Sequence, residues 1–453
     1  MDETESKQKQ SGGPCPADAS KGVSSRPATS RRAFRFVCAI MATGGWVSLS
    51  GMNGCPSGTL PAPSPTIGGA SAFLGVDVCR KCHREIHATW LTSRHAGALT
   101  TLVNMSEQNN PQCLSCHTTG YREGGFVSAT ATPKFGGVQC EACHGPGGVH
   151  PGTRNPADIV RTPLTEVCAK CHTGAAQPNH DEWLLSRHAQ ALTDVRNDAA
   201  AADTCLNCHS FDYARVVRRN AVRALQGLPG DPLPSITDGD TATDPQNPVG
   251  CASCHAPHGS AFLAQLRMAP MATCAACHTE SSPTPGTLPH APQFNILTAT
   301  GGQQRSSVAG QSPVSLTGTR ATHSALDAVG GCAKCHGRIV RLADPTDATP
   351  NESGHLFNIV FDNCSPCHSA SDAANLASGV QSEISTRLAS LRQRADALSG
   401  RVLTALDRSR LDAATLDLDL VNRDRSRGVH NAPYVRQLLD AAEALLNDIP
   451  PSS

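Results

Sequence analysis

The sequence predicts a mainly helical protein with much irregular loop, and three observations support this fold class. A five-residue pattern that suits a single helical turn recurs along most of the chain. With 39 Gly, 32 Pro and 4% aromatic residues among 453, the chain lacks the apolar side chains of an ordinary globular core. Near the C-terminus, apolar residues return every three or four positions, which predicts amphipathic helices.

The recurring pattern is Cys-x-x-Cys-His, the attachment sequence of a c-type haem. It occurs nine times and uses 18 of the 21 cysteines. Positions i, i+3 and i+4 share one face of a helix, so both thiols and the imidazole can reach one porphyrin together. The thiols then form thioethers, and the imidazole binds the iron as its proximal ligand. The motif residues are Cys79, Cys82 and His83; Cys113, Cys116 and His117; Cys140, Cys143 and His144; Cys168, Cys171 and His172; Cys205, Cys208 and His209; Cys251, Cys254 and His255; Cys274, Cys277 and His278; Cys332, Cys335 and His336; and Cys364, Cys367 and His368.

Nine covalently attached haem c groups, each with its iron, are therefore the predicted cofactors. Zinc is the alternative for paired cysteines, but a structural zinc site joins two Cys-x-x-Cys knuckles, or one knuckle and a spaced pair of histidines. Nothing in zinc chemistry requires a His after every second Cys. Large apolar porphyrins would also replace the missing side chains, so we expect a haem-stacked core.

Residues 1–55 are predicted to be a leader that carries an export signal. The run Ser-Arg-Arg-Ala-Phe at 30–34, followed by a moderately apolar stretch over 36–52, resembles a twin-arginine signal. A plain secretory signal is the alternative, and a poor lipobox ending at Cys55 makes that residue a candidate lipid anchor. In each case we expect export to the periplasm or the outer face of a membrane. Residues 56–72 form a Pro/Gly/Ser linker.

The region 73–280 repeats itself and is predicted to be a seven-haem core. Trp90-Leu-Thr-Ser-Arg-His95-Ala follows the first motif, and Trp183-Leu-Leu-Ser-Arg-His188-Ala follows the fourth. Two four-motif units that share the fourth motif explain this repetition. The second unit carries an insertion near 226–250, rich in Pro, Gly and Asp, which predicts a surface loop.

Two further motifs lie in a predicted extension over 281–375, and residues 376–449 are predicted to form C-terminal helices. Apolar spacing places one helix at about 381–408 and a second at about 433–447, with Asn431 as N-cap. Packing against the haem core is the favoured role of these helices. Dimerisation through the first helix, which would make the protein a homo-oligomer, is the alternative.

The segments around the first three motifs carry a specific resemblance. The pattern Trp-x-x-Ser-x-His-Ala after the first motif, the run CLSCHTTGY from Cys113 and the run GVQCEACHGPG around Cys140 resemble the cytochrome c-554 family. That family is related to multihaem nitrite reductases and hydroxylamine oxidoreductases. The resemblance implies closely packed haems, most with two His ligands, that pass electrons between redox partners. All nine motifs here end in His, so the lysine-ligated haem motif of pentahaem nitrite reductases is absent.

Ten histidines lie outside the motifs, and nine irons need up to nine distal ligands. A distal His must approach the porphyrin face opposite the proximal His, so His258, three residues after His255, must serve another haem. His87 and His180 both precede the repeated Trp by three residues and should share one role; if neither is a ligand, one haem stays open. The expected distal ligands are His95, His150, His188, His258, His290, His323, His355 and His430, with His180 as a further candidate.

Two His ligands leave an iron no free position, so we expect an electron carrier with redox proteins as donor and acceptor. The alternative is an oxidoreductase that acts on a small nitrogen or sulfur compound at one five-coordinate haem; no catalytic residue is assigned for it. The chain has 38 basic and 38 acidic side chains without a basic stripe, so nucleic acid is not an expected partner.

Overall fold

The computed structural model describes residues 72–161, 164–280, 288–302, 321, 323, 330–365 and 367–451. All of these residues belong to the unit Asn53–Ser453. The expected export signal, the candidate lipid anchor at Cys55 and nearly all of the expected linker lie outside the described residues, as does most of the stretch 281–320.

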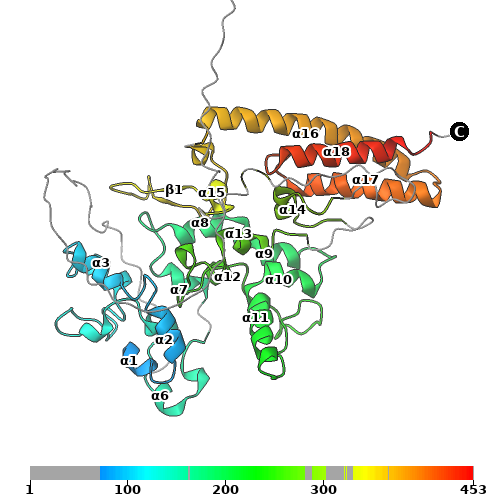
Figure 1. Ribbon diagram of the computed structural model, residues 1–453. Helices are drawn as coiled ribbons and strands as arrows, with labels where there is room; N and C mark the ends of the chain where they lie inside the picture. Colours follow the sequence, from blue (N-terminus) through cyan, green and yellow to red (C-terminus); the bar gives the residue numbers. More distant parts are fainter. Residues whose placement is uncertain are drawn as a thin grey trace, which may run out of the picture. The chain divides into compact units, whose positions relative to one another are not determined.

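The described chain is mainly helical with long irregular connections, which confirms the predicted fold class (Figure 1). The α-helices up to residue 298 are α1 (Val76–Cys79), α2 (Arg84–Trp90), α3 (Ala98–Asn104), α4 (Pro111–His117), α5 (Cys140–His144), α6 (His150–Thr153), α7 (Thr165–Ala169), α8 (Asn179–Leu185), α9 (Arg187–Arg196), α10 (Leu206–His209), α11 (Phe211–Leu225), α12 (Cys251–Cys254), α13 (Pro270–Ala275) and α14 (Gln293–Thr298). The later α-helices are α15 (Ala333–His336), α16 (Ala370–Ser399), α17 (Ala405–Asp424) and α18 (Ala432–Asn447). Short 3-10 turns are η1 (Pro133–Phe135), η2 (Pro156–Asp158), η3 (Asp203–Cys205), η4 (Leu263–Gln265) and η7 (Phe361–Cys364). The strands β1 (Ile339–Val340) and β2 (Glu352–Ser353) pair antiparallel.

The attachment motifs adopt the helical turn that their spacing predicts. In the fourth motif the His172 backbone N–H donates to the Cys168 carbonyl at 2.9 Å, and in the seventh the His278 N–H donates to the Cys274 carbonyl at 2.9 Å. This bond between the first and fifth motif residues closes one turn of α-helix. The two thiols and the imidazole of a motif therefore share one face.

The internal duplication is visible in equivalent hydrogen bonds. Trp90 and Trp183 are both buried, and their indole N–H groups donate to the carbonyls of Val138 (3.0 Å) and Val249 (2.9 Å). Each Trp thus ties the helix after one motif to the chain just before another. Buried indole N–H groups need such a partner, which explains why the Trp recurs with its surroundings.

The insertion after α11 is a loop, with no helix or strand between Leu225 and Cys251. Two carboxylates hold it in place. Asp203 accepts hydrogen bonds from the Ile236 N–H (2.8 Å) and the Ser235 hydroxyl (2.7 Å), and Asp212 accepts from the Asn247 N–H (2.8 Å).

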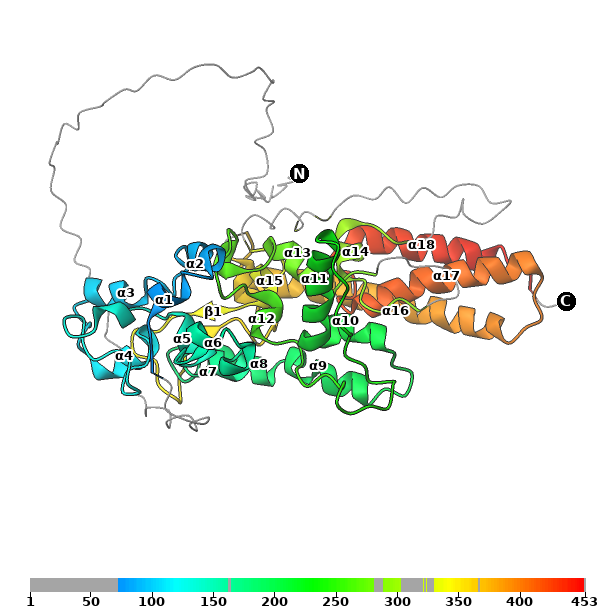
Figure 2. The same cartoon turned by 90° about the horizontal axis from the view of Figure 1, so that it is seen from below.

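The C-terminal helices α16, α17 and α18 pack side by side into a three-helix bundle (Figures 1 and 2). Each begins at a capping residue: the Ser369 and Thr404 hydroxyls accept from the Asp372 and Asp407 N–H groups at 3.1 Å, and the Asn431 side chain accepts from the Tyr434 N–H at 3.2 Å. The predicted helix at 433–447 and its Asn431 cap are confirmed. The bundle core is made by the buried side chains of Ile384, Leu388, Leu391, Leu411, Leu418, Leu420, Val421, Leu438, Leu439 and Leu445.

The expected helix at 381–408 needs correction. The structure divides this region between α16, which begins earlier and ends at Ser399, and α17, which was not predicted. Val402, which lies within the expected helix, is fully exposed in the connection between them. The stripe formed by Ile384, Leu388 and Leu391 is buried against the other two helices of the same chain. The alternative that this stripe forms a dimer interface is therefore wrong.

The bundle is attached to the segment that follows the seventh motif. Ile296 of α14 is fully buried in the bundle core, and the Gly302 N–H donates to the Tyr434 hydroxyl at 3.0 Å. Among the helices of the described ranges, none combines the length and the apolar character that a membrane span requires.

Candidate haem sites

Seven of the nine motif histidines each face one histidine from outside the motifs. In every such pair the two imidazole centroids are separated by 5.8 to 6.5 Å. The pairs are His95 with His172 (6.2 Å), His258 with His144 (6.1 Å), His188 with His278 (6.2 Å), His290 with His209 (5.8 Å), His355 with His255 (6.1 Å), His323 with His368 (6.5 Å) and His430 with His336 (6.2 Å).

This spacing fits an iron between the two rings. A bond from a metal to an imidazole nitrogen is about 2 Å, and the ring centre lies about 1.2 Å behind that nitrogen, so two ligands on opposite sides of one iron have centroids about 6.3 Å apart. Each of the seven pairs also combines one motif His with one non-motif His. The residues present therefore fit haem groups with a proximal and a distal His.

The pairs follow the duplication of the chain. His95 faces the fourth motif at His172, and its counterpart His188 faces the seventh motif at His278. In the third motif of each unit, the motif histidine instead faces an imidazole from further along the chain. His258, near the sixth motif, faces His144 of the third motif, in agreement with the expectation that it serves another haem.

His83 and His117 are the two motif histidines for which the described residues provide no second imidazole at this spacing. The structure places the three remaining histidines elsewhere. His87 and His180 lie against Trp90 and Trp183, each with ring centroids 5.6 Å apart, which supports one shared role for this pair. The third, His150, directs its Nδ1 to the Asn155 carbonyl at 3.0 Å. The distal roles of His150 and His180 stay predictions.

Thiols of different motifs also lie in contact. The hydrogen bond from the Cys171 thiol lowers the pKa of Cys116, and a hydrogen bond between the paired thiols likewise lowers the pKa of Cys208 beside Cys277. Because the thioethers sit at porphyrin edges, motifs with touching thiols would hold their haems edge to edge. The thiol pairs are Cys79 with Cys140, Cys116 with Cys171, Cys168 with Cys251, Cys208 with Cys277 and Cys274 with Cys332.

Hydrogen bonds to Nδ1 orient several motif imidazoles. The Nδ1 atoms of His117 and His209 lie 2.9 and 3.1 Å from the carbonyls of Ala98 and Ala191, which are equivalent positions of the two units. An Nδ1–H that donates to a carbonyl leaves the other ring nitrogen free for a metal. These carbonyl partners at Nδ1 therefore leave the Nε2 lone pair available to bind iron.

Burial lowers the pKa of several paired imidazoles and so favours the neutral form, which binds metals. It lowers the pKa of His188 to about 4 and also lowers the pKa values of His95 and His172. The pKa of His430 shifts in the opposite direction. Burial alone would lower its pKa, but the hydrogen bond and charge of Asp424 give a net upward shift.

Two acidic residues that position candidate ligands were missed by sequence reasoning. Glu182 accepts from the Ser353 and His355 N–H groups, both at 2.7 Å, and so fixes the chain around His355. Asp424 meets the ring of His430. Neither residue lies at a recurrent spacing from a motif, so the sequence could not predict that these two carboxylates position ligands.

Residues 78–145 match the family described as Cytochrome c554 and c-prime, and residues 245–283 match the doubled CXXCH motif. The multiheme cytochrome MtrA of Shewanella baltica is 26% identical over 203 residues, which cover 39% of this chain and 55% of MtrA. Cytochrome c-554 of Nitrosomonas europaea is 30% identical over 91 residues, which cover 17% of this chain and 39% of that protein. The chain thus spans about half, or less, of the length of these curated relatives.

A solved structure extends the likeness to most of the fold. The undecaheme cytochrome from the S-layer of Carboxydothermus ferrireducens aligns with a TM-score of 0.59 and 19% identity, covering 87% of this chain and 71% of that chain. The nine attachment motifs on this fold define a multihaem c-type cytochrome, a class that carries covalent haem c and transfers electrons. Within that class the chain is similar to the cytochrome c554 family over residues 78–145, which contain its first three motifs.

Proposed function

We propose that the protein is an exported nonahaem cytochrome that carries electrons along a chain of haems, most of them with two His ligands. The seven imidazole pairs are the observation that carries this proposal. An iron held between two imidazoles has no free position for a substrate, so it can only gain and lose electrons. The distal ligands in this proposal are His95, His188, His258, His290, His323, His355 and His430.

The contacts between thiols support transfer along the chain rather than nine isolated sites. Through its two thiols, the fourth motif has neighbours in the second and sixth motifs, because Cys171 contacts Cys116 and Cys168 contacts Cys251. The seventh motif likewise has neighbours in the fifth and eighth, through Cys277 and Cys274. Edge-to-edge haems at these junctions would form two groups of neighbours, one at the second, fourth and sixth motifs and the other at the fifth, seventh and eighth motifs.

The proposed layout is a seven-haem core over 73–280 and a two-haem extension over 281–375, followed by the helical bundle. Redox proteins would serve as donor and acceptor. Attachment of haem c outside the cytoplasm requires export, so we place the mature protein in the periplasm or at the outer face of a membrane, with Cys55 as a candidate lipid anchor.

Mass spectrometry and redox titration of protein purified from its own host test this proposal. We expect the mature polypeptide to carry nine haem increments and to take up nine electrons reversibly. Fewer than nine increments in fully matured protein, or haems that do not re-oxidise with a protein acceptor, would contradict it.

A second candidate is an oxidoreductase that acts on a small nitrogen or sulfur compound. Its supporting observation is that His83 and His117 face no second imidazole within the described ranges. A five-coordinate iron at either motif could bind such a compound directly. Nitrite, hydroxylamine and sulfite should then perturb the haem spectrum, and a protein whose spectrum none of them changes would exclude this activity.

A further inference from the structure

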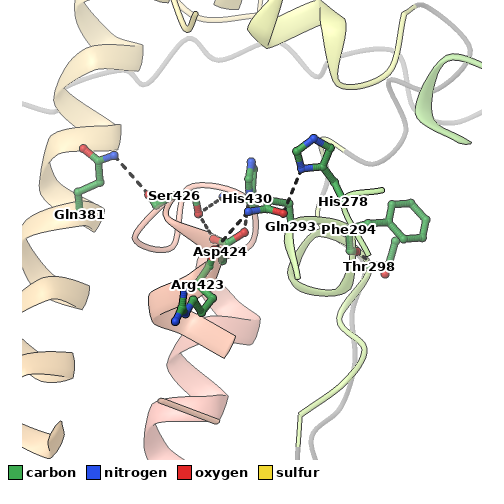
Figure 3. A network of polar contacts seen from close by, with 9 residues as sticks. All are labelled: His278, Gln293, Phe294, Thr298, Gln381, Arg423, Asp424, Ser426 and His430. Carbon is green, nitrogen blue, oxygen red and sulfur yellow. Dashed lines mark hydrogen bonds and ion pairs between the residues drawn. The ribbon is translucent and has the colours of Figure 1, made fainter. Parts of the chain in front are cut away.

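The ring of His430 is held by a buried carboxylate. Its Nδ1 lies 2.5 Å from Oδ1 of Asp424, whose side chain is fully buried (Figure 3). The second carboxylate oxygen of Asp424 accepts a hydrogen bond from the Ser426 hydroxyl. Both oxygens are therefore engaged, and one of them points at the candidate ligand of the eighth haem.

A tight turn between α17 and α18 creates this contact. Asp424 is the last residue of α17, and Arg425 follows in the left-handed conformation, with φ of 63°. At Gly428 φ is 93°, and a Cβ there would lie 2.9 Å from Ile384 and 3.0 Å from Val380, so the turn packs directly on α16. The Gln381 amide also donates to the Ser426 carbonyl at 3.3 Å. The bundle thus fixes the distance between Asp424 and His430.

The partner of His430 differs in kind from those of the other candidate ligands. His255 and His209 have backbone carbonyls on Nδ1, and His278 has the side-chain amide of Gln293 at 3.3 Å. In the part of the chain that the structure describes, His430 alone among the paired imidazoles has a carboxylate hydrogen-bonded to its ring. Asp424 has no Arg or Lys partner in the same ranges, so His430 is the one ionisable side chain that its carboxylate contacts there.

A carboxylate that accepts the Nδ1–H of a ligand imidazole makes that imidazole a stronger electron donor. Such a donor stabilises ferric iron more than ferrous iron, which lowers the reduction potential. We propose that Asp424 is a positioning residue that lowers the reduction potential of the haem attached at Cys332 and Cys335, acting through His430. This inference rests on the proposed ligation of that haem by His336 and His430.

The same turn also touches the neighbouring site. The Gln293 amide that orients His278 donates to the Arg423 carbonyl at 3.2 Å (Figure 3). The thiols Cys274 and Cys332 of the seventh and eighth motifs are in contact. The histidine of the seventh haem therefore has a neutral amide partner, while that of the adjacent eighth haem has a carboxylate partner. The proposal thus predicts different reduction potentials for these two haems, at the junction between the core and the extension.

Asp424→Asn in the full-length haem-loaded protein tests the proposal, because it keeps the shape and removes the charge. The equilibrium constant for reducing one haem should rise at least tenfold, or about 59 mV for one electron. The resonance of one low-spin ferric haem should shift with it, while nine haems stay attached. The matched control is Asp419→Asn on the same helix, where Asp419 pairs with Arg392 at 2.5 Å and meets no candidate ligand.

Ser426→Ala should move the potential in the opposite direction. Removing the hydroxyl donor concentrates the carboxylate charge on the oxygen that faces His430, so the same haem should become harder to reduce. A general loss of structure cannot produce opposite shifts in the two variants. If Asp424→Asn releases His430 and creates a high-spin iron, the potential measured for Ser426→Ala shows whether Asp424 lowers the reduction potential of this haem.

Unchanged potentials in Asp424→Asn with nine low-spin haems, or no downward shift in Ser426→Ala, would overturn the role of Asp424. The double variant Cys332→Ala with Cys335→Ala, which lacks the eighth haem, identifies the signal. If the Asp424-sensitive haem persists in that background, the assignment of His430 to His336 is wrong. Electron transfer through the remaining haems is measured separately by re-oxidation, so that outcome leaves the proposed function standing.

Discussion

The ring of His188, at the start of α9, lies 6.2 Å from the ring of His278, the last residue of the seventh motif. Replacing His188 by Ala should open one iron, because the cavity left by the imidazole holds no other ligand of its kind within the described ranges. We expect one haem to become high-spin and to bind carbon monoxide, as seen by electron paramagnetic resonance and difference spectra. Arg187→Ala is the control, since that neighbouring side chain is exposed and pairs with Asp194. A purely low-spin His188→Ala protein would show that the pair does not share an iron.

Leu438 of α18 is fully buried in the bundle core. Leu438→Ala should lower the free energy of unfolding of the bundle by about 2–5 kcal/mol, the usual cost of a cavity in a packed core. Val402→Ala, at an exposed position, should change it by no more than about 0.5 kcal/mol. Denaturant titration followed by circular dichroism measures both. Equal stability of the two variants would mean that the three helices do not share a core.

Tyr434 makes the bundle sensitive to alkali. Burial raises the pKa of its hydroxyl to about 12, against an ordinary value near 10. A group whose folded pKa is raised contributes stability below the unfolded pKa and loses it as pH rises through the folded one. Between pH 10 and 12 the bundle should lose up to about 3 kcal/mol of stability.

Tyr434→Phe removes the titrating hydroxyl and with it the acceptor for the Gly302 N–H. This variant should be less stable than the parent at pH 8 but should show a weaker further loss between pH 10 and 12. Alkaline unfolding curves of the two proteins provide the comparison. Parallel curves would exclude Tyr434 as the source of the alkaline loss.

Arg218 and Arg267 form a like-charged pair near haem-binding thiols. Partial desolvation and the neighbouring Arg267 lower the pKa of Arg218, while the charges of Cys277 and Cys254 act in the other direction. A positive charge favours the reduced state of a nearby haem, and because Arg218 is exposed, solvent screens part of this effect. Arg218→Leu should therefore make at least one haem harder to reduce, by less than about 1 kcal/mol, the value for an unscreened unit charge at roughly 15 Å in an effective dielectric of about 20. Arg187→Leu is the control, because Arg187 is exposed and pairs with Asp194, and it should leave every potential in the redox titration unchanged. If the two variants have equal potentials, Arg218 does not influence the potential of a haem.

The sequence predicts the local conformation of the attachment motifs well, because each motif is a single helical turn. The helix after Asn431 was predicted for the same reason, since its cap and apolar spacing lie within a few residues. The partner of each motif His depends instead on contacts between distant segments, as for His355 and His255. Helix α17 was missed because acidic residues such as Asp417 lie in its buried face and interrupt the apolar pattern.

Counting the spin states of the irons tests the central claim most directly. Within the residues that the structure describes, seven imidazole pairs on nine motifs leave two irons, those of His83 and His117, without a paired ligand. Quantitative electron paramagnetic resonance of the intact ferric protein should therefore find at least seven low-spin irons and no more than two high-spin irons. Three or more high-spin irons in protein that retains all nine haems would contradict the account.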